Sequence, residues 1–128
     1  MNSQNFFELA LENQKNNNFE EAIKNYKKVL KVEPDHFIAL FNSALIFSKS
    51  KRYKSAIKYF KRAIKIKPDN ANCYNNLGNV YKDQGKLKES KIYYEKTIKI
   101  EPRHANAHYN LGSLYFTKNN ILKAKECY

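Results

Sequence analysis

Residues 74–81 read Tyr-Asn-Asn-Leu-Gly-Asn-Val-Tyr, with large apolar side chains at the first, fourth and eighth positions and glycine at the fifth. Side chains three and four residues apart lie on one face of an α-helix, so this stretch predicts a helix that packs through a single side. The glycine permits another helix to approach closely. Ser90 and Tyr94 belong to a second helical stripe, which Pro102 ends because proline disfavours helical geometry in the residue before it. Residues 71–104 are therefore expected to form a pair of antiparallel helices.

The same pattern recurs every 34 residues, at the spacing of the three prolines, Pro34, Pro68 and Pro102. In this register the chain divides into repeats at 3–36, 37–70 and 71–104 and an incomplete repeat at 105–128. Equivalent positions hold large apolar residues (Phe6, Leu40, Tyr74), small residues (Ala10, Ala44, Gly78, Gly112) and aromatic residues (Tyr26, Phe60, Tyr94, Tyr128). The chain, residues 1–128, is thus predicted to be a single all-α array of stacked helical hairpins.

A short turn is expected to join the two helices of each repeat. The predicted turns lie at residues 16–18, 50–52, 84–86 and 118–120. Asn17, Gly85 and Asn119 occupy the middle position of three of them. Glycine, and after it asparagine, adopts positive φ most readily, so we expect a left-handed residue at these three positions.

The composition is typical of a folded helical protein. Apolar residues make up 42% of the chain and only three glycines occur, so the mean hydropathy of -0.78 does not indicate disorder. The amino end lacks the pattern of a signal peptide, and no apolar stretch reaches the ~18 residues of a membrane span. We expect an intracellular, most simply cytoplasmic, protein. Cys73 and Cys127 lack the spacing of a zinc site or a disulfide framework, so free thiols are predicted.

Catalysis is not predicted. His36, His104 and His108 are the only histidines, no glycine-rich phosphate loop is present, and no recognisable motif places an acid beside a base. His104 and His108 stand at helical spacing, but His104 falls in a connection between repeats and His108 replaces a core aromatic residue. We expect no enzyme activity, no cofactor and no metal site in these residues.

The repeated pattern resembles the tetratricopeptide-repeat (TPR) family, in which an aromatic residue, a Leu-Gly pair, a tyrosine, an alanine, another aromatic residue and a proline follow in order. The resemblance covers residues 3–128 and is closest in the third repeat, where Ser90 stands in place of the usual alanine. Asn13, Ser43 and His108 depart from the pattern. The resemblance implies a right-handed superhelix whose first helices line a concave groove and whose second helices form a convex back. It also implies a protein partner.

Helical spacing assigns a series of residues to the groove side of the first helices. The series is apolar in the first two repeats (Phe7, Leu11, Phe41, Leu45) and richer in amides in the last two (Asn72, Asn75, Asn76, Asn79, Asn106, Tyr109, Asn110). Asn42, Asn76 and Asn110 recur every 34 residues, and an amide can donate to a carbonyl and accept from an N–H of an extended chain. This asparagine ladder resembles that of O-linked N-acetylglucosamine transferase repeats, which implies binding of a partner's backbone. Alternatively, an asparagine-rich composition fills these positions with solvated amides.

Another use of such grooves is to clamp a carboxy-terminal carboxylate with paired Lys and Asn side chains, as co-chaperones do. The positions where cations would be needed hold Phe7, Asn72 and Asn76, and only Asn42 agrees with the clamp. A carboxylate-terminated tail is therefore not the expected ligand.

The net charge of +12 is concentrated in the second repeat. Residues 37–70 hold nine Lys or Arg against one acid, whereas residues 1–36 hold five against six. A basic stripe at three- and four-residue steps is predicted on the convex side, formed by Lys54, Lys58, Lys61, Arg62 and Lys65. The simplest reading is a solvated face. An acidic protein, or else a nucleic acid or anionic membrane, is the alternative partner, although no aromatic residues interleave the stripe to stack bases.

Two classes of function remain open. The chain is expected to be a scaffold that binds an extended segment of a partner protein within a larger complex, or a substrate-docking arm of an enzyme such as a glycosyltransferase. The incomplete last repeat leads us to expect a continuation beyond Tyr128. A catalytic domain in that continuation would favour the second class.

Overall fold

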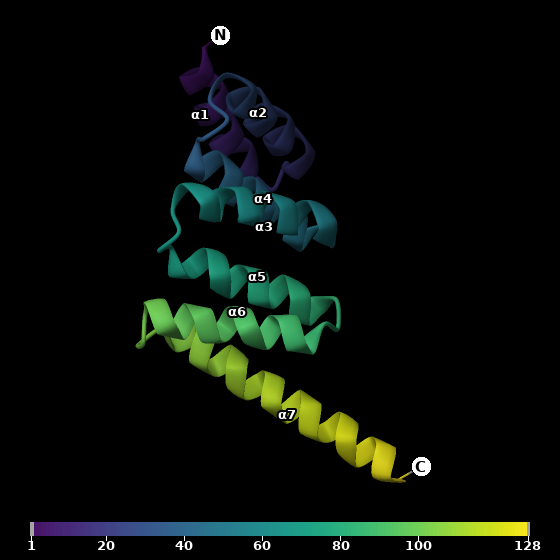
Figure 1. Ribbon diagram of the computed structural model, residues 1–128. Helices are drawn as coiled ribbons and strands as arrows, with labels where there is room; N and C mark the ends of the chain where they lie inside the picture. Colours follow the sequence, from purple (N-terminus) through teal and green to yellow (C-terminus); the bar gives the residue numbers. More distant parts are fainter. Residues whose placement is uncertain (1, 128) are drawn as a thin grey trace. The chain divides into compact units, whose positions relative to one another are not determined.

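The computed structural model describes the backbone of residues 2–127 and the side chains of residues 2–122. The helices are α1 (Ser3–Lys15), α2 (Phe19–Val32), α3 (Phe37–Lys49), α4 (Tyr53–Ile66), α5 (Ala71–Asp83), α6 (Leu87–Ile100) and α7 (Ala105–Cys127), as Figure 1 shows. No strand occurs in the described part of the chain, which confirms the all-α prediction. None of these helices, within the described residues, is long and apolar enough to cross a membrane.

The chain divides after Pro68 into two compact units, the first holding α1 to α4 and the second α5 to α7. In the first unit α1 packs against α2, α3 against α4, and α2 against α3. In the second unit α6 packs against both α5 and α7. The helices α1, α3, α5 and α7 begin 34 residues apart, as the period of the sequence requires.

The turns inside the first three hairpins share one backbone geometry. Asn17, Lys51 and Gly85 have φ of 62°, 60° and 78°, so the predicted left-handed conformation of Asn17 and Gly85 is confirmed. The next residue in each turn donates its N–H back to a carbonyl of the preceding helix at 2.8 Å (Asn18 to Asn13, Arg52 to Phe47, Lys86 to Tyr81). This bond closes the helix end and gives one of its last carbonyls a partner.

The turn predicted at residues 118–120 is wrong, because α7 continues through Asn119 without a break. In the other repeats a second helix of 14 residues packs back on the first. Continuing the helix instead gives each backbone N–H an intrahelical partner.

Small residues mark where the paired helices come closest. Ala10 and Ala44 are completely buried, and Gly78 lies so near the ring of Tyr94 that a Cβ there would be 2.5 Å from a ring carbon. Ser90, at the position where alanine is usual, donates its hydroxyl to the carbonyl of Gly78 at 2.8 Å. The substitution therefore places a polar group in the core together with its hydrogen-bond partner.

Helices α3, α5 and α7 each begin with a side-chain cap that was not predicted from the sequence. His36 Nδ1, Asn70 Oδ1 and His104 Nδ1 accept the N–H of the residue three positions on, at 3.1, 3.2 and 3.0 Å. Their 34-residue spacing was a usable signal, since an acceptor before a helix satisfies one of its first N–H groups. The second helices α2, α4 and α6 begin without a side-chain cap bond.

Candidate functional site

In the first unit, Asn42 on α3 is oriented by a buried tyrosine. Its Nδ2 donates to the hydroxyl of Tyr26 at 3.1 Å, and that hydroxyl donates to Gln14 Oε1 at 2.5 Å. The ring of Tyr26 is fully buried, and burial raises the pKa of its phenol although the bond from Asn42 partly lowers it. The hydroxyl therefore stays protonated and can keep both bonds. No hydrogen bond reaches Asn42 Oδ1 from the described residues.

The apolar residues assigned to this side of the first unit are only partly accessible. Phe7 is half-buried, with its ring centroid 6.3 Å from that of Tyr26 and 4.6 Å from that of His36. Phe41 is half-buried and meets the ring of Phe60 edge-on at 5.8 Å. Leu11 is exposed and Leu45 half-buried. These residues serve the packing of the unit and still present an apolar edge.

In the second unit, three of the predicted asparagines form one network. Asn110 on α7 donates its Nδ2 to Asn75 Oδ1 and Asn79 Oδ1, each at 3.2 Å. Asn79 Oδ1 also accepts the hydroxyl of Tyr94 at 2.5 Å. Burial of the Tyr94 phenol raises its pKa to about 12, so the hydroxyl remains a donor at neutral pH. The network joins α5, α6 and α7, and it leaves Asn110 Oδ1 without a partner among the described residues.

The remaining predicted residues of this unit differ in their surroundings. Asn72 Oδ1 lies 2.9 Å from His104 Nε2, on the ring whose Nδ1 caps α7, so the neutral ring donates to it from Nε2. Asn76 is half-buried and makes no side-chain hydrogen bond within the described residues. Asn106 is exposed, and Tyr109 is 76% exposed.

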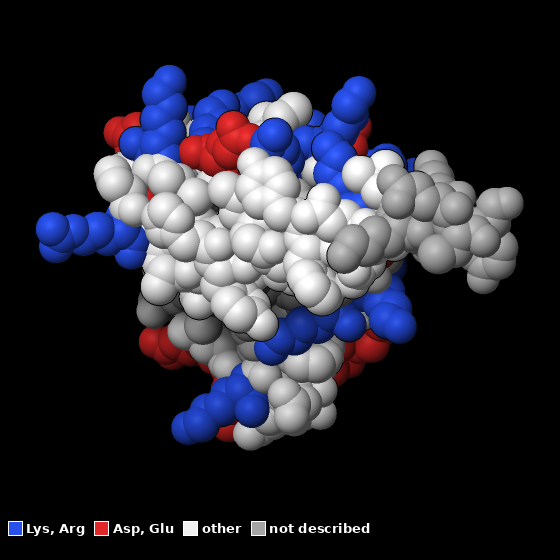
Figure 2. All heavy atoms as spheres, turned by 90° about the horizontal axis from the view of Figure 1, so that it is seen from below, with Lys and Arg blue, Asp and Glu red and all other residues white. Residues whose placement is uncertain are grey.

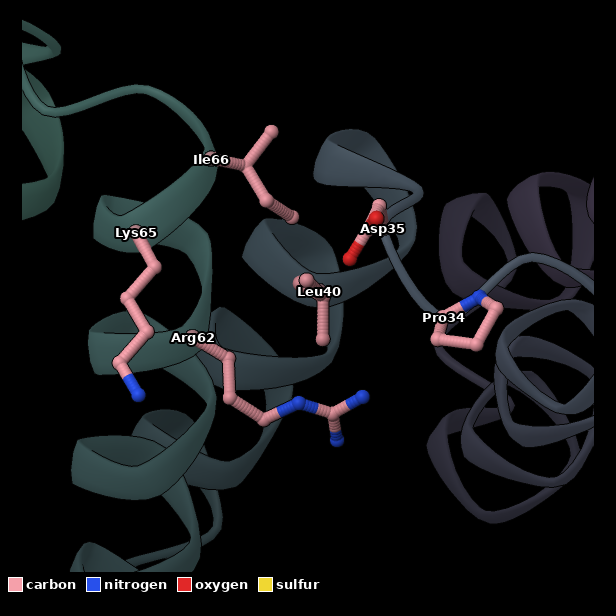
Figure 3. Close-up of a pocket in the computed structure, with 6 residues that line it drawn as sticks. All are labelled: Pro34, Asp35, Leu40, Arg62, Lys65 and Ile66. Atoms are coloured by element: carbon pink, nitrogen blue, oxygen red, sulfur yellow. The ribbon is translucent and has the colours of Figure 1, made fainter.

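The basic stripe follows α4 in the first unit. Lys54, Lys58, Lys61 and Lys65 are exposed, but Arg62 is half-buried, with its guanidinium 5.3 Å above the ring of Tyr59. A pocket of about 470 Å³ opens beside Arg62, as Figure 3 shows. Its lining residues are Pro34, Asp35, Leu40, Arg62, Lys65 and Ile66. The stripe is thus not a uniformly solvated face, because one end of it borders a cavity with apolar walls.

A second cavity, of about 570 Å³, lies between α6 and α7 in the second unit. Its apolar lining includes Leu87, Ile92, Leu114 and Tyr115, and Ile92 is 62% exposed. Over residues 105–122, α7 holds a single charged side chain, Lys118. Figure 2 shows a face of the molecule whose middle is occupied mainly by uncharged residues.

Models of the tetratricopeptide-repeat family match residues 7–71, 71–104 and 93–126. The first of these matches alone covers half of the chain. A comparison with curated protein sequences finds no match.

Several solved structures share the fold. MamA is 25% identical, with a TM-score of 0.87 over 92% of this chain and 69% of that one. The first TPR of Spaghetti, bound to an HSP90 peptide, is 21% identical, with a TM-score of 0.84 over 91% of this chain and 93% of that one. The O-GlcNAc transferase of Thermobaculum terrenum is 23% identical, with a TM-score of 0.77 over 88% of this chain and 22% of that one.

Proposed function

This chain belongs to the tetratricopeptide-repeat family of protein-interaction scaffolds, and we propose that it binds an extended segment of a partner protein on the faces of its first helices. The ladder asparagines would hold the backbone of that segment. The apolar edges of the same faces would select its side chains. The solved Spaghetti repeat with an HSP90 peptide supports a peptide ligand for this fold.

The observation that carries the proposal is the orientation of two ladder amides. Asn42 uses one of its two Nδ2 hydrogens on Tyr26, and Asn110 uses Nδ2 on both Asn75 and Asn79, so Oδ1 is left for a ligand in both residues and Asn42 keeps one further N–H. An amide oxygen accepts hydrogen bonds and cannot donate them. We therefore propose that these two asparagines accept backbone N–H groups of the partner. Asn76, which has no such bond, could both donate and accept.

Side-chain selection would come from residues that keep an exposed apolar edge. Phe41 and Leu45 offer such edges in the first unit, and Tyr109 offers an almost fully exposed ring in the second. Aromatic anchors, tyrosine among them, are enriched among the residues that carry most of the binding energy at protein interfaces. The absence of cations at Phe7, Asn72 and Asn76 keeps a carboxy-terminal tail from being the preferred ligand.

A docking arm of a larger enzyme is the second candidate. It is favoured by the likeness to an O-GlcNAc transferase, in which the matched region is 22% of the chain. In that case the same faces would hold the substrate of a catalytic domain elsewhere. Binding of an extended segment is common to both candidates, so one experiment tests the shared step.

The test is a backbone scan of a peptide selected from a random library on the purified chain. Each backbone N–H of the peptide is replaced in turn by an ester oxygen, which removes a donor and keeps the extended shape. We expect losses of roughly tenfold at the few positions that donate to Oδ1 of Asn42 or Asn110. Those positions should become insensitive in the Asn42→Ala and Asn110→Ala variants. Uniform tolerance of the ester scan would contradict backbone recognition by the ladder.

A further inference from the structure

We infer that α4 carries a second interaction surface, for an acidic protein segment whose carboxylates lie on the lysine stripe and whose apolar side chain enters the pocket beside Arg62. This surface is formed by Lys54, Lys58, Lys61, Arg62 and Lys65 with the pocket walls Pro34, Leu40 and Ile66. It shares no residue with the proposed peptide site, so either one can fail in an experiment without the other.

The stripe has no compensating charge. Helix α4 contains five cations and no acidic residue. Within the part of the chain that the structure describes, the one ion pair is Lys91 with Glu95 on α6, so none of the five is paired. Cations at i and i+4, such as Lys54 with Lys58, repel one another along a helix. A partner that brings carboxylates would relieve this repulsion.

The pocket lies at the end of the stripe that Arg62 and Lys65 form. Figure 3 shows Arg62 extending from α4 toward the loop that holds Pro34, with Lys65 one turn away along the helix. Stacking on Tyr59 restricts the guanidinium to this direction. The floor is Leu40, which is fully buried, so the cavity joins an apolar base to a rim with two cations, Arg62 and Lys65, and one acid, Asp35. An apolar side chain flanked by carboxylates matches both parts.

The same residues disfavour a nucleic acid. Proteins that bind single-stranded nucleic acids commonly combine cations for the phosphates with exposed aromatic rings for the bases. The ring of Tyr59 on α4 is covered by Arg62 and packs 5.1 Å from Phe47. Asp35 also lines the pocket, so the apolar side chain of the partner and not one of its carboxylates is expected to enter there. The observations therefore favour an acidic polypeptide.

Helix α6 supplies a matched control within the same chain. One repeat later, Lys88 and Lys99 occupy the positions of Lys54 and Lys65. All four lysines are exposed. The stripe is interrupted on α6, however, because Ile92 and Glu95 stand where α4 has Lys58 and Lys61. Reversing either pair of lysines changes the net charge equally and alters the proposed surface in only one case.

The experiment measures binding of a short labelled peptide rich in glutamate that carries one leucine. The full chain is compared with the variants Lys54→Glu/Lys65→Glu and Lys88→Glu/Lys99→Glu, after circular dichroism has verified that each is folded. We expect the α4 variant to lose about tenfold or more in affinity and the α6 variant to lose much less. Arg62→Gln should also weaken binding, and replacing the leucine of the peptide with serine should weaken it further.

Three results would overturn the inference. Equal losses in the two double variants would mean that the peptide does not prefer the α4 surface to the lysines of α6, which include Lys88 beside the second cavity. Undiminished affinity of the serine peptide would mean that the pocket takes no part. Tighter, α4-dependent binding of an oligouridine of equal charge would assign the stripe to nucleic acid. Tenfold weaker binding in the α4 variant, with loss on the serine substitution and weak oligouridine binding, would support it.

Discussion

The ring of Tyr94 lies directly against the backbone of Gly78, so a methyl group added at residue 78 would come within 2.5 Å of ring atom Cε1. The ring is completely buried and has no room to move. We predict that Gly78→Ala lowers the free energy of unfolding. Overpacking costs about 1–3 kcal/mol, which exceeds the gain of about 1 kcal/mol from the higher helix propensity of alanine. Urea denaturation measures the difference.

Gly112 is the control for this prediction, because a Cβ there would meet nothing within 4 Å. Gly112 is exposed on α7, so Gly112→Ala should raise the free energy of unfolding by up to about 1 kcal/mol. A change of the same sign in both variants would show that packing against Tyr94 does not decide the outcome.

Stability should fall in alkali as Tyr94 ionises. Its pKa in the folded state is about 12, above the usual value of 10 for tyrosine, so the folded state retains the proton that the unfolded chain releases. The resulting stabilisation is complete below pH 10 and is lost as the pH rises to about 12, a change on the order of 2 kcal/mol. In Tyr94→Phe this part of the pH dependence should disappear. Urea denaturation across this range, with exposed Tyr109→Phe as control, provides the measurement.

The histidine cap of α7 should be replaceable by the residue that caps α5. His104→Asn keeps a side-chain acceptor for the N–H of Ala107, as Asn70 does for Cys73. His104→Ala removes it and should lower the free energy of unfolding by about 1 kcal/mol. The difference between the two variants in thermal unfolding isolates the cap. Similar melting temperatures for asparagine and alanine would contradict this role.

The left-handed residue of the second turn is Lys51, and we predict that replacing it with glycine stabilises the protein. At φ of 60°, Lys51 carries a conformational penalty of about 1–2 kcal/mol that glycine does not have. Lys51→Gly also increases the entropy of the unfolded chain, which offsets about 0.4–1 kcal/mol of this gain. We expect net stabilisation in chemical denaturation. Gly85→Ala, at φ of 78° and with open space around it, should destabilise for the same backbone reason.

Removal of ladder amides should weaken binding with little dependence on ligand sequence. Asn110→Ala forfeits a contact to the peptide backbone, worth roughly 0.5–1.5 kcal/mol, which all peptides share. Phe41→Ala should instead change which sequences are preferred, because it alters an apolar edge. Titration of a panel of selected peptides distinguishes the two patterns. A folded Asn76→Ala/Asn110→Ala variant with undiminished affinity for the panel would refute the ladder.

The period of the sequence was enough to predict the hairpins because each repeat buries the same kinds of side chain at the same positions. Asn17 and Gly85 were predictable for a related reason, since few residues tolerate positive φ. Lys51 shows that the turn can impose this conformation on a residue that disfavours it. The turn at Asn119 failed because asparagine permits a left-handed residue but does not require one.

The candidate site was predicted less completely, because periodicity gives the face of a helix and not the partner of a side chain. Asn75 and Asn110 were both assigned to an open surface, yet one is buried and the other bonds to it. The length of a tyrosine side chain explains this, since Tyr94 reaches from α6 past its own packing position to Asn79. Such reach across helices cannot be counted along a sequence. The cap by His104 was not predicted because histidine is better known as a catalytic or metal-binding residue than as a helix cap.

The repeats differ by a single hydroxyl group at the aromatic position shared by Tyr26, Phe60 and Tyr94. All three rings are fully buried, so the interior accepts either residue at that position. The two tyrosines carry a hydroxyl that reaches a surface amide, whereas the phenylalanine offers none. Exchanging tyrosine and phenylalanine at this buried position can therefore change which atoms of a surface amide are free to form hydrogen bonds. Recognition in such an array can be tuned from the interior, one repeat at a time, while every residue on the surface stays the same.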